Sequence, residues 1–311
     1  MSAAEDSAAQ DGQGHPLAGR RILVTGAEGL IGSAVCARLA AAGASITGLS
    51  LSDYRADHHD QLPPTDLDRV VHGDATDVQP VADALTDVDL VVHLAAIPNP
   101  NGYEQYTVFR TNVNATFNVL NQAAQRGIRR AVIASSINAT GLTFNSHPVL
   151  PSYYPIDETM PSDLDEAYSL SKYVDEITAA TMHRHWGIDV VALRFPFTQT
   201  AEAIARHSQH VTEHPEAGVV EGWSYLDVRD AARAVELALL TEVAGAIPIF
   251  VAADDTLLPY PTDDLLDRYA PGVLRNRPFI GREVPMELTR ARKVLGFRAE
   301  HRLALTEEPL G

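Results

Sequence analysis

The chain has 311 residues, enough to bury a large core, and this length allows about one to three domains. Its 24 Lys and Arg residues are outnumbered by 41 Asp and Glu residues, so the formal net charge of -17 repels nucleic-acid phosphates and anionic lipid surfaces. Nucleic acid and membrane are therefore not expected as partners, and the single cysteine, Cys36, excludes an intramolecular disulfide.

The first 18 residues differ from the rest of the chain. They are acidic and lack the charged and then apolar pattern of a signal sequence. No later segment approaches the apolar run of about 20 residues that a membrane-spanning helix needs. We therefore predict that 1–18 is a disordered leader and that the protein is cytoplasmic.

A glycine-rich turn follows the first apolar segment. Residues 21–26, RILVTG, predict a strand, and 29–43 predict a helix that opens on glycines. Gly26 permits a tight turn, Gly29 lets backbone approach a pyrophosphate, and Gly32 lets the helix pack on the strand. The helix N-terminus would stabilise the anion. This context favours a dinucleotide site over the alternative, a tight turn without a ligand.

The second predicted strand, 44–51, ends where the ribose of the adenosine would be recognised. An acidic residue there would accept hydrogen bonds from the ribose hydroxyls and repel a 2′-phosphate. The expected position falls on Ser50, with Asp53 and Arg55 just beyond. A neutral Ser50 near Arg55 tolerates a 2′-phosphate, so we expect NADP in preference to NAD. Asp53 could serve NAD if the strand is longer.

The next two predicted strands, 68–74 and 88–96, also end at this edge. The Asp74 carboxylate can bond the adenine amino group, or it can cap the N-terminus of the helix that follows. The fourth strand ends in the sequence HLAA, whose small residues let the chain pass close to a cofactor. We expect His93, the first residue of this sequence, to be packed in the core and not catalytic.

Alternation of strands and helices continues to residue 195. Helices are predicted at 103–127 and 164–187, strands at 129–136 and 188–195, and a Pro-rich loop at 138–163. Strands separated by helices of this length imply right-handed crossovers and a parallel sheet covered on both faces. The sequence therefore predicts an α/β fold with a doubly wound parallel sheet.

The pattern changes after Arg194. Segment 197–220 is polar, carries histidines and lacks a clear period, so we predict a loop or lid. Helices at 228–241, 262–270 and 287–296 and a strand at 246–253 follow. We predict a Rossmann-type dinucleotide-binding domain over 19–194 and a mixed region over 195–311. Within that region, 227–254 would return to the Rossmann core, while 195–226 and 255–311 would form a small substrate cap.

A possible proton-transfer site lies in DEAYSLSKYVDE, residues 165–176. Tyr168 and Lys172 lie one helical turn apart, although such a pair can also belong to a solvated face. Ser135 and Ser136 end a predicted strand, at the edge where open α/β sheets bind ligands. A serine hydroxyl can hold a reacting substrate oxygen while Tyr168 moves its proton. The Lys172 ammonium would lower the tyrosine pKa from about 10 towards the working pH.

The chain resembles the extended short-chain dehydrogenase/reductases. The resemblance rests on the glycine pattern, the serines that end the strand at 129–136, HLAA (93–96), TNVNAT (111–116), YSLSK (168–172) and YLDVRDAARAVELAL (225–239). That family holds the nucleotide-sugar epimerases and dehydratases, and the resemblance covers about 20 to 300. It implies that Tyr168 is the general acid/base and that Lys172 binds the nicotinamide ribose. It also implies that Ser136 donates to the substrate oxygen, with Ser135 the lesser candidate, and that Asn112 supports a proton relay.

Two sets of contacts are predicted on this basis. The cofactor contacts are Gly26, Gly29, Leu30, Ile31, Gly32, Ser50, Arg55, Asp74, Ala75, Leu94, Ala95, Ala96, Tyr168, Lys172 and Phe195. The substrate contacts are Ser136, Asn138, Tyr168 and Arg194, although Arg194 could instead tie down the following loop.

Within the family, SSINATG (135–141) and GWSYLDVRD (222–230) are closest to uronate-dehydrogenase-like members, which oxidise the anomeric carbon of a sugar with NAD. The chain departs from them at Ser50, where they have an acidic residue, and at Asn138, where they have a histidine. The resemblance therefore does not identify uronate as the substrate.

Other side chains are weaker candidates. The histidines at 207, 210 and 214 have near-helical spacing, but no cysteine or ordered carboxylate completes a four-ligand site, so no metal is predicted. A histidine that contacts substrate from a lid is the favoured interpretation. Four aromatic residues could line a sugar pocket or pack the loops: Phe144, Tyr153, Tyr154 and Trp223.

The expected function is an NAD(P)-dependent oxidoreductase acting on a hydroxyl or carbonyl of a sugar-like or small polyhydroxylated molecule. An epimerase with tightly bound NAD is the alternative, followed by a non-catalytic dinucleotide sensor. The two long helices, 103–127 and 164–187, resemble the pair through which family members dimerise, so the resemblance also implies a homodimer.

Overall fold

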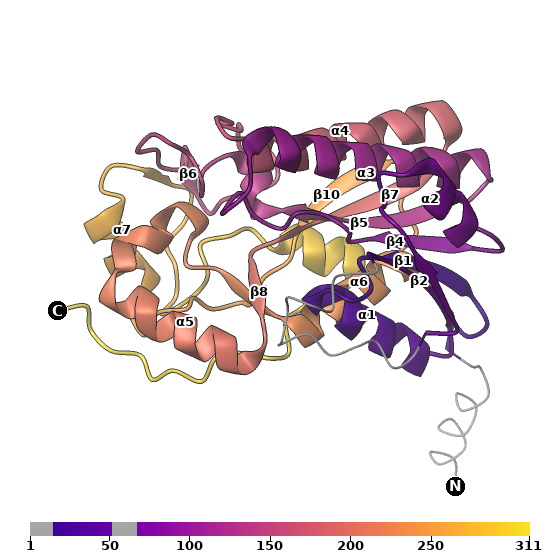
Figure 1. Cartoon of the computed structure of the whole chain (residues 1–311). Coiled ribbons are helices and arrows are strands. Elements are labelled where there is room, and N and C mark those ends of the chain that lie inside the picture. Colours follow the sequence, from indigo (N-terminus) through magenta and orange to yellow (C-terminus); the bar gives the residue numbers. More distant parts are fainter. Residues whose placement is uncertain (1–14, 52–66) are drawn as a thin grey trace, which may run out of the picture.

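The computed structural model describes residues 15–51 and 67–311 and is built around a parallel sheet (Figure 1). Its seven strands, in spatial order, are β3 (Arg69–His72), β2 (Ser45–Ser50), β1 (Arg21–Thr25), β4 (Leu90–His93), β5 (Arg130–Ser136), β7 (Asp189–Phe195) and β10 (Ala246–Phe250). All neighbouring strands in the sheet run parallel, which confirms the predicted doubly wound fold. The chain reverses direction across the sheet between β1 and β4, where such folds bind ligands.

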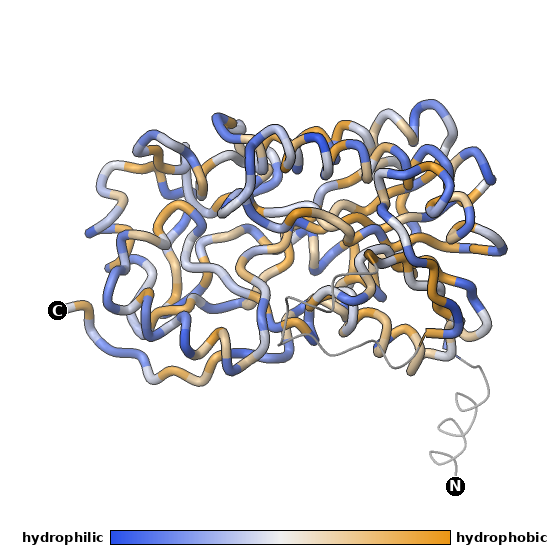
Figure 2. The backbone as a smooth tube through the Cα atoms, viewed as in Figure 1, coloured by the Kyte–Doolittle hydropathy of each residue, from blue (hydrophilic) through white to orange (hydrophobic). Residues whose placement is uncertain are grey.

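Helices cover both faces of the sheet (Figure 1). On one face α1 (Leu30–Ala41) packs against α6 (Val228–Leu240), and on the other α3 (Gln105–Gln125) packs against α2 (Val78–Ala84) and α4 (Ala167–Trp186). Successive strand residues point to opposite faces, so Ile22 and Val24 enter one core and Leu23 enters the other. Figure 2 shows hydrophobic residues running along the strands at the centre of the molecule.

A smaller region lies beside the carboxyl edge of the sheet (Figure 1). It contains two short parallel strand pairs, α5, α7 and two further helical turns. Their bounds are β6 (Tyr153–Tyr154) with β11 (Leu274–Arg275), β8 (Phe197–Gln199) with β9 (Tyr225–Asp227), α5 (Ala201–Glu213), α7 (Thr262–Tyr269), the 3-10 helix η2 (Pro215–Glu221) and the π-helical turn η3 (Ala291–Leu295). Another 3-10 helix, η1 (Ile137–Thr140), follows β5 directly.

The prediction of a loop over 197–220 is wrong, because α5 and η2 occupy most of that segment, and a role as a lid stays a prediction. Ile204, Ser208 and Val211 are the buried residues of α5, and they lie on one helix face. A serine in the middle of this face hides the apolar period that would have predicted the helix. The Pro-rich loop also carries more structure than expected, because β6 pairs with β11 of the smaller region.

The segment predicted as a leader, 1–18, overlaps the described residues at its end. There the side chain of Leu17 is buried in the core beside α1. The packed part of the chain therefore includes residues that the sequence assigned to the leader. In the part of the chain that the structure describes, no helix has the length and apolar character to span a membrane.

Candidate active site

The glycine-rich turn between β1 and α1 brings three backbone segments into close contact. Gly26 has a φ of +67°, and a Cβ atom there would lie 2.9 Å from the backbone nitrogen of Ala95. A Cβ atom on Gly32 would lie 2.0 Å from the carbonyl oxygen of Gly26. Side chains are therefore excluded at both positions. The first turn of α1 carries no acidic residue and Gly29 supplies no side-chain cap, so its N–H groups can receive a pyrophosphate.

Ser50 ends β2 as predicted, and it is 6% exposed. Its hydroxyl has no hydrogen-bond partner among the described residues. A buried hydroxyl in this state fits a site that a ribose would complete. Arg55 and Asp53 lie outside the described residues.

Asp74 follows β3 and its carboxylate Oδ1 accepts the backbone N–H of Thr76 at 2.8 Å. The residue at the N-cap of α2 is Asp77, so the alternative prediction that Asp74 caps this helix is wrong. Ala75 beside it is buried.

The residues after β4 are hydrogen-bonded to Thr25, which directly precedes the glycine turn. The Thr25 hydroxyl accepts the N–H groups of Leu94 and Ala95 at 3.2 and 3.1 Å. It also lies 2.8 Å from Nδ1 of His93, whose Nε2 is 3.1 Å from the Thr116 hydroxyl. Burial lowers the pKa of His93 to about 3. This neutral, hydrogen-bonded ring agrees with the prediction of a packed histidine.

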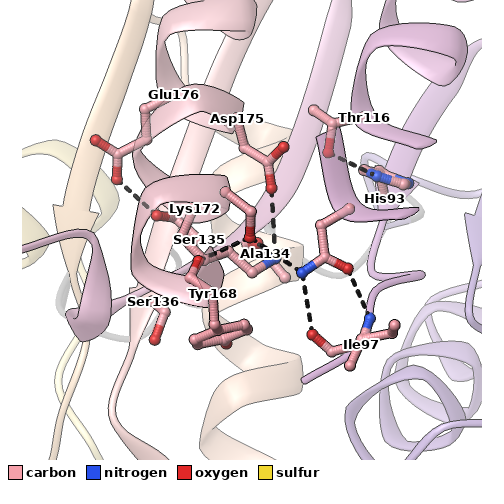
Figure 3. A network of polar contacts seen from close by, with 12 residues as sticks. His93, Ile97, Thr116, Ala134, Ser135, Ser136, Tyr168, Lys172, Asp175 and Glu176 are labelled. Atoms are coloured by element: carbon pink, nitrogen blue, oxygen red, sulfur yellow. Dashed lines mark hydrogen bonds and ion pairs between the residues drawn. The ribbon is translucent and has the colours of Figure 1, made fainter. Parts of the chain in front are cut away.

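The two serines at the end of β5 have different partners. The Ser135 hydroxyl donates to Glu176 at 2.6 Å (Figure 3). The Glu176 carboxylate also accepts two bonds of 2.8 Å from Arg194. The Ser136 hydroxyl accepts the backbone and side-chain N–H groups of Asn138, each at 3.1 Å. Among the described residues, the Ser136 hydroxyl is therefore not engaged by a carboxylate as Ser135 is, and its contact with a substrate oxygen stays a prediction.

Tyr168 and Lys172 lie near the start of α4 and both are buried. The Glu166 carboxylate caps this helix by accepting the N–H groups of Tyr168 and Ser169. The Lys172 ammonium lies 5.9 Å from the centre of the Tyr168 ring and donates to the Ala134 carbonyl at 2.9 Å. Figure 3 shows Ser136, Tyr168 and Lys172 where β5 meets α4.

The protonation of Tyr168 differs from the prediction. Burial raises the pKa of Tyr168 above its ordinary value, while Lys172 and a hydrogen bond with Ser136 act in the opposite direction. Lys172 therefore has the predicted influence, but the desolvation of the phenol outweighs it. The expectation of a net fall in this pKa is wrong.

Asn112 of α3 is fully buried. Its Oδ1 accepts the N–H of Ile97 at 2.8 Å, and its Nδ2 donates to the Ile97 carbonyl and to the Ser171 hydroxyl, each at 3.1 Å. Ser171 in turn donates to the Tyr168 carbonyl at 2.7 Å. These bonds fix the segment after β4 against α4. The role of Asn112 in a proton relay stays a prediction.

Two of the predicted substrate contacts, Arg194 and Asn138, are buried. The Arg194 side chain is buried and donates through two of its three guanidinium nitrogens to Glu176, so it joins β7 to α4. Its contact with substrate stays a prediction. Asn138 is also buried, but its Oδ1 has no partner among the described residues. Phe195, in register with Ser136 on the adjacent strand, is buried.

Most of the other aromatic and histidine candidates pack within the protein. Tyr154 donates to the Val219 carbonyl at 2.6 Å and Trp223 donates to the Pro215 carbonyl at 2.7 Å, and both rings are fully buried. His207 stacks on Phe197 at 4.1 Å. Phe144 alone of the four aromatic candidates has a ring contact with the catalytic candidate Tyr168, at 6.0 Å, within the described residues. It is therefore the best placed of them to form a pocket wall.

Two acidic residues near this site were missed from the sequence. Asp175 lies three positions after Lys172, and its carboxylate is 3.5 Å from the lysine ammonium. Glu221 ends η2 in the smaller region and lies beside Thr143, next to Phe144. The i, i+3 spacing of Lys172 and Asp175 was a usable signal for the first. No local pattern marks Glu221, because only the tertiary fold brings η2 to this place.

Glu221 gives a pH-dependent prediction of stability. Burial raises the pKa of Glu221 from 4.5 to about 7, although Thr143 opposes this in part. The folded state therefore binds more protons than the unfolded state between these values, and stability falls as pH rises through them. We expect Glu221→Gln to raise the free energy of unfolding by up to about 3 kcal/mol at alkaline pH and to have little effect below pH 4.5.

Chemical denaturation at several pH values measures this difference. Glu216→Gln is the matched control, since Glu216 lies on the same 3-10 helix with an exposed side chain. A gain in stability that is the same at acidic and alkaline pH would contradict the assignment of the raised pKa to Glu221.

The chain is similar to known proteins over most of its length. A family model described as NAD dependent epimerase/dehydratase family matches residues 22–252. The chain is 28% identical over 179 residues to NAD-dependent glucose-6-phosphate dehydrogenase of Haloferax volcanii, a match that covers 56% of this chain and 66% of that protein. It is 30% identical over 246 residues to dTDP-glucose 4,6-dehydratase of Streptomyces niveus, covering 73% of this chain and 71% of that protein. These matches thus span about two thirds of each curated relative's length.

Solved structures share the fold. One is a short-chain dehydrogenase/reductase superfamily protein from Agrobacterium tumefaciens with bound NAD, with a TM-score of 0.66, 24% identity, and coverage of 91% of this chain and 93% of that one. Another is a mutated uronate dehydrogenase, with a TM-score of 0.58, 21% identity, and coverage of 83% and 82%.

Proposed function

Because this chain belongs to the NAD-dependent epimerase/dehydratase family, within the extended short-chain dehydrogenase/reductases that its motifs resemble, we propose that it is an NAD(P)-dependent oxidoreductase. Its substrate is a sugar-like or small polyhydroxylated molecule that reacts at a hydroxyl or carbonyl group. The names of the two curated relatives refer to glucose carrying a phosphate or a nucleotide, which supports a sugar-like substrate.

One observation carries this proposal. Ser136, Tyr168 and Lys172 converge where β5 meets α4, on the same sheet edge as the glycine turn (Figure 3). The Ser136 hydroxyl, oriented by Asn138, holds the reacting oxygen of the substrate. As a phenolate Tyr168 accepts the proton from that oxygen during oxidation, and as a phenol it returns the proton during reduction. When bound, the nicotinamide supplies or accepts the hydride.

The residues present fit a dinucleotide. Gly26, Gly29 and Gly32 leave room for a pyrophosphate at the start of α1, and the buried Ser50 hydroxyl is available to a ribose. A neutral serine at this place does not repel a 2′-phosphate as a carboxylate would. We infer that NADP is accepted as well as NAD and is the preferred form. Calorimetric titration with each oxidised dinucleotide tests the preference.

The function is tested by incubating the purified protein with NAD or NADP and a panel of aldoses, uronic acids and sugar nucleotides. The expected result is a rise in the absorbance of reduced nicotinamide with one class of substrate. Mass spectrometry of the protein as purified is the companion measurement. Retained dinucleotide without net reduction would favour the epimerase, whereas dinucleotide binding with no turnover of any kind would favour the sensor.

We further propose a homodimer formed through α3 and α4. Each of these helices exposes large apolar side chains: Tyr106 and Phe117 on α3, and Leu170, Tyr173 and Ile177 on α4. Residues 170, 173 and 177 follow one helix face. Exposed apolar faces mark interaction sites, and most soluble oligomers are homo-oligomers with a two-fold axis, which supports burial of this face in a second copy.

We therefore expect Ile177→Asp to convert the dimer to a monomer, because it would place a charge in the apolar contact. Light scattering after size-exclusion chromatography measures the mass. Ile280→Asp is the matched control, since Ile280 is even more exposed but lies on the smaller region, outside both helices. A wild-type protein that is already monomeric would overturn the proposed dimer.

A further inference from the structure

Among the described residues, the Lys172 ammonium has two hydrogen-bonding or ion-pair partners. It donates to the Ala134 carbonyl at 2.9 Å, and it lies 3.5 Å from Oδ2 of Asp175 (Figure 3). The Lys172 and Asp175 side chains are 5% and 2% exposed. An ammonium group has three N–H donors, so these two contacts leave one donor. Ala134 belongs to β5 and Asp175 to α4, so these two contacts fix the position of the ammonium and the direction of its third N–H group.

Asp175 also lies near polar groups of neighbouring elements. On α3 the Thr116 side chain lowers the pKa of Asp175, and its hydroxyl lies 3.1 Å from Nε2 of His93 on β4. Nδ1 of His93 lies 2.8 Å from the Thr25 hydroxyl, which accepts the N–H groups of Leu94 and Ala95 after β4. A series of polar side chains thus lies between Asp175 and the turn that would hold the dinucleotide.

The charges around Asp175 are few. Lys172 is the cation that faces it, and Glu176 on the same helix is the neighbouring acid, whose carboxylate is taken up by Arg194. Burial holds His93 neutral, and Tyr168 lies one turn before Lys172. The ionised Asp175 carboxylate raises the pKa of Tyr168, whereas the Lys172 ammonium lowers it. The two charges therefore act on the same phenol in opposite directions.

We propose that Asp175 is a positioning residue for Lys172, which holds the lysine ammonium in place for the dinucleotide and partly cancels its charge at Tyr168. This inference deepens the proposed function and rests on it for the roles of Lys172 and Tyr168. The supporting argument is energetic. Burying an ion pair is seldom more stable than burying apolar residues of similar size, so this pair is poorly explained by stability alone.

The protonation of Asp175 supplies a second line of support. Burial raises the pKa of Asp175 to about 6, against the opposing influence of Lys172 and Thr116. Above this pH the carboxylate is ionised and holds Lys172, and below it the carboxyl is neutral and holds it less well. The affinity for a dinucleotide should therefore weaken as pH falls through about 6.

The test compares wild type with Asp175→Asn, which keeps the shape of the side chain and removes its charge. Two quantities are measured. The first is the pKa of Tyr168, followed by NMR of ring-labelled tyrosine and assigned with Tyr168→Phe. The second is the dissociation constant of NAD, measured by calorimetry on either side of pH 6. Asp165→Asn is the matched control, because Asp165 lies just before the N-cap residue of this helix and bonds Ser146 instead of Lys172.

We expect Asp175→Asn to lower the pKa of Tyr168 and to weaken NAD binding above pH 6 by about tenfold, with the pH dependence of binding lost. Asp165→Asn should leave both quantities unchanged. If Asp175→Asn folds poorly, Thr116→Val tests the same network, since loss of its hydroxyl should raise the pH at which binding weakens. Unchanged Tyr168 pKa and NAD affinity in folded Asp175→Asn would overturn the proposal.

Neither measurement requires turnover. A protein in which Asp175→Asn has both effects but no substrate is ever turned over would contradict the proposed function and leave this inference standing. Normal turnover with no effect of Asp175→Asn on either quantity would contradict this inference and leave the proposed function standing.

Discussion

Tyr168→Phe is expected to lower turnover of an identified substrate by about a hundredfold to ten-thousandfold while leaving dinucleotide binding nearly unchanged. The substitution removes one hydroxyl and keeps the ring that contacts Phe144 and lies near Lys172. Proton transfer is lost because the phenylalanine side chain has no ionisable group. Steady-state kinetics give the turnover, and calorimetric titration with NAD gives the affinity.

Tyr173→Phe is the matched control for this prediction. Tyr173 lies on the same helix, but its side chain is exposed, so removal of its hydroxyl should leave turnover unchanged. Near-normal turnover of Tyr168→Phe would show that this helix face does not transfer the proton. A large loss of NAD affinity in the same variant would instead assign Tyr168 to cofactor binding.

The sheet was predictable because strands buried on both faces have a strong local signal. Continuous apolar and β-branched runs separated by helices leave few arrangements other than a parallel, doubly wound sheet. The smaller region lacks such a signal. Ser208 interrupts the apolar face of α5, and β6 is only two residues long with a partner more than a hundred residues away. Short strands and mixed helix faces depend on tertiary contacts that spacing does not reveal.

The identity of the candidate site residues could be predicted from the sequence, but the direction of the Tyr168 pKa shift could not. The motif placed Ser136, Tyr168 and Lys172 together, and the structure brings them to one sheet edge. The pleat separates Ser135 from Ser136, and this explains why the adjacent hydroxyl bonds Glu176 instead. The net rise in the pKa of Tyr168 could not be foreseen, because it depends on how deeply the fold buries the ring.

Asp175 illustrates a different limit. Its spacing from Lys172 is visible in the sequence, but i, i+3 pairs of opposite charge are common on exposed helices and contribute little there. Burial gives this pair its significance, since each side chain is 5% exposed or less. The sequence indicates that the two residues are close, and only the packing of α4 against β5 and α3 shows that they are desolvated together.

Lys172→Ala should impair both dinucleotide binding and turnover, unlike Tyr168→Phe. The substitution removes the ammonium that contacts Ala134 and Asp175, and with it the donor proposed for the nicotinamide ribose. Loss of one hydrogen bond from a charged donor corresponds to about tenfold in affinity or more. Turnover should fall by at least about a hundredfold, because the phenol of Tyr168 also loses the charge that lowers its pKa.

Asp175 should respond to the same substitution. Without Lys172 its buried carboxylate has lost the cation that lowers its pKa, so this pKa should rise above about 6 and the group should be neutral over a wider pH range. Lys293→Ala is the matched control, because Lys293 is the other lysine of the chain and its side chain is exposed. Calorimetry and kinetics on both variants separate the two roles. If Lys172→Ala bound NAD as tightly as wild type and lost only turnover, the lysine would act on Tyr168 alone, and its assignment to the ribose would be wrong.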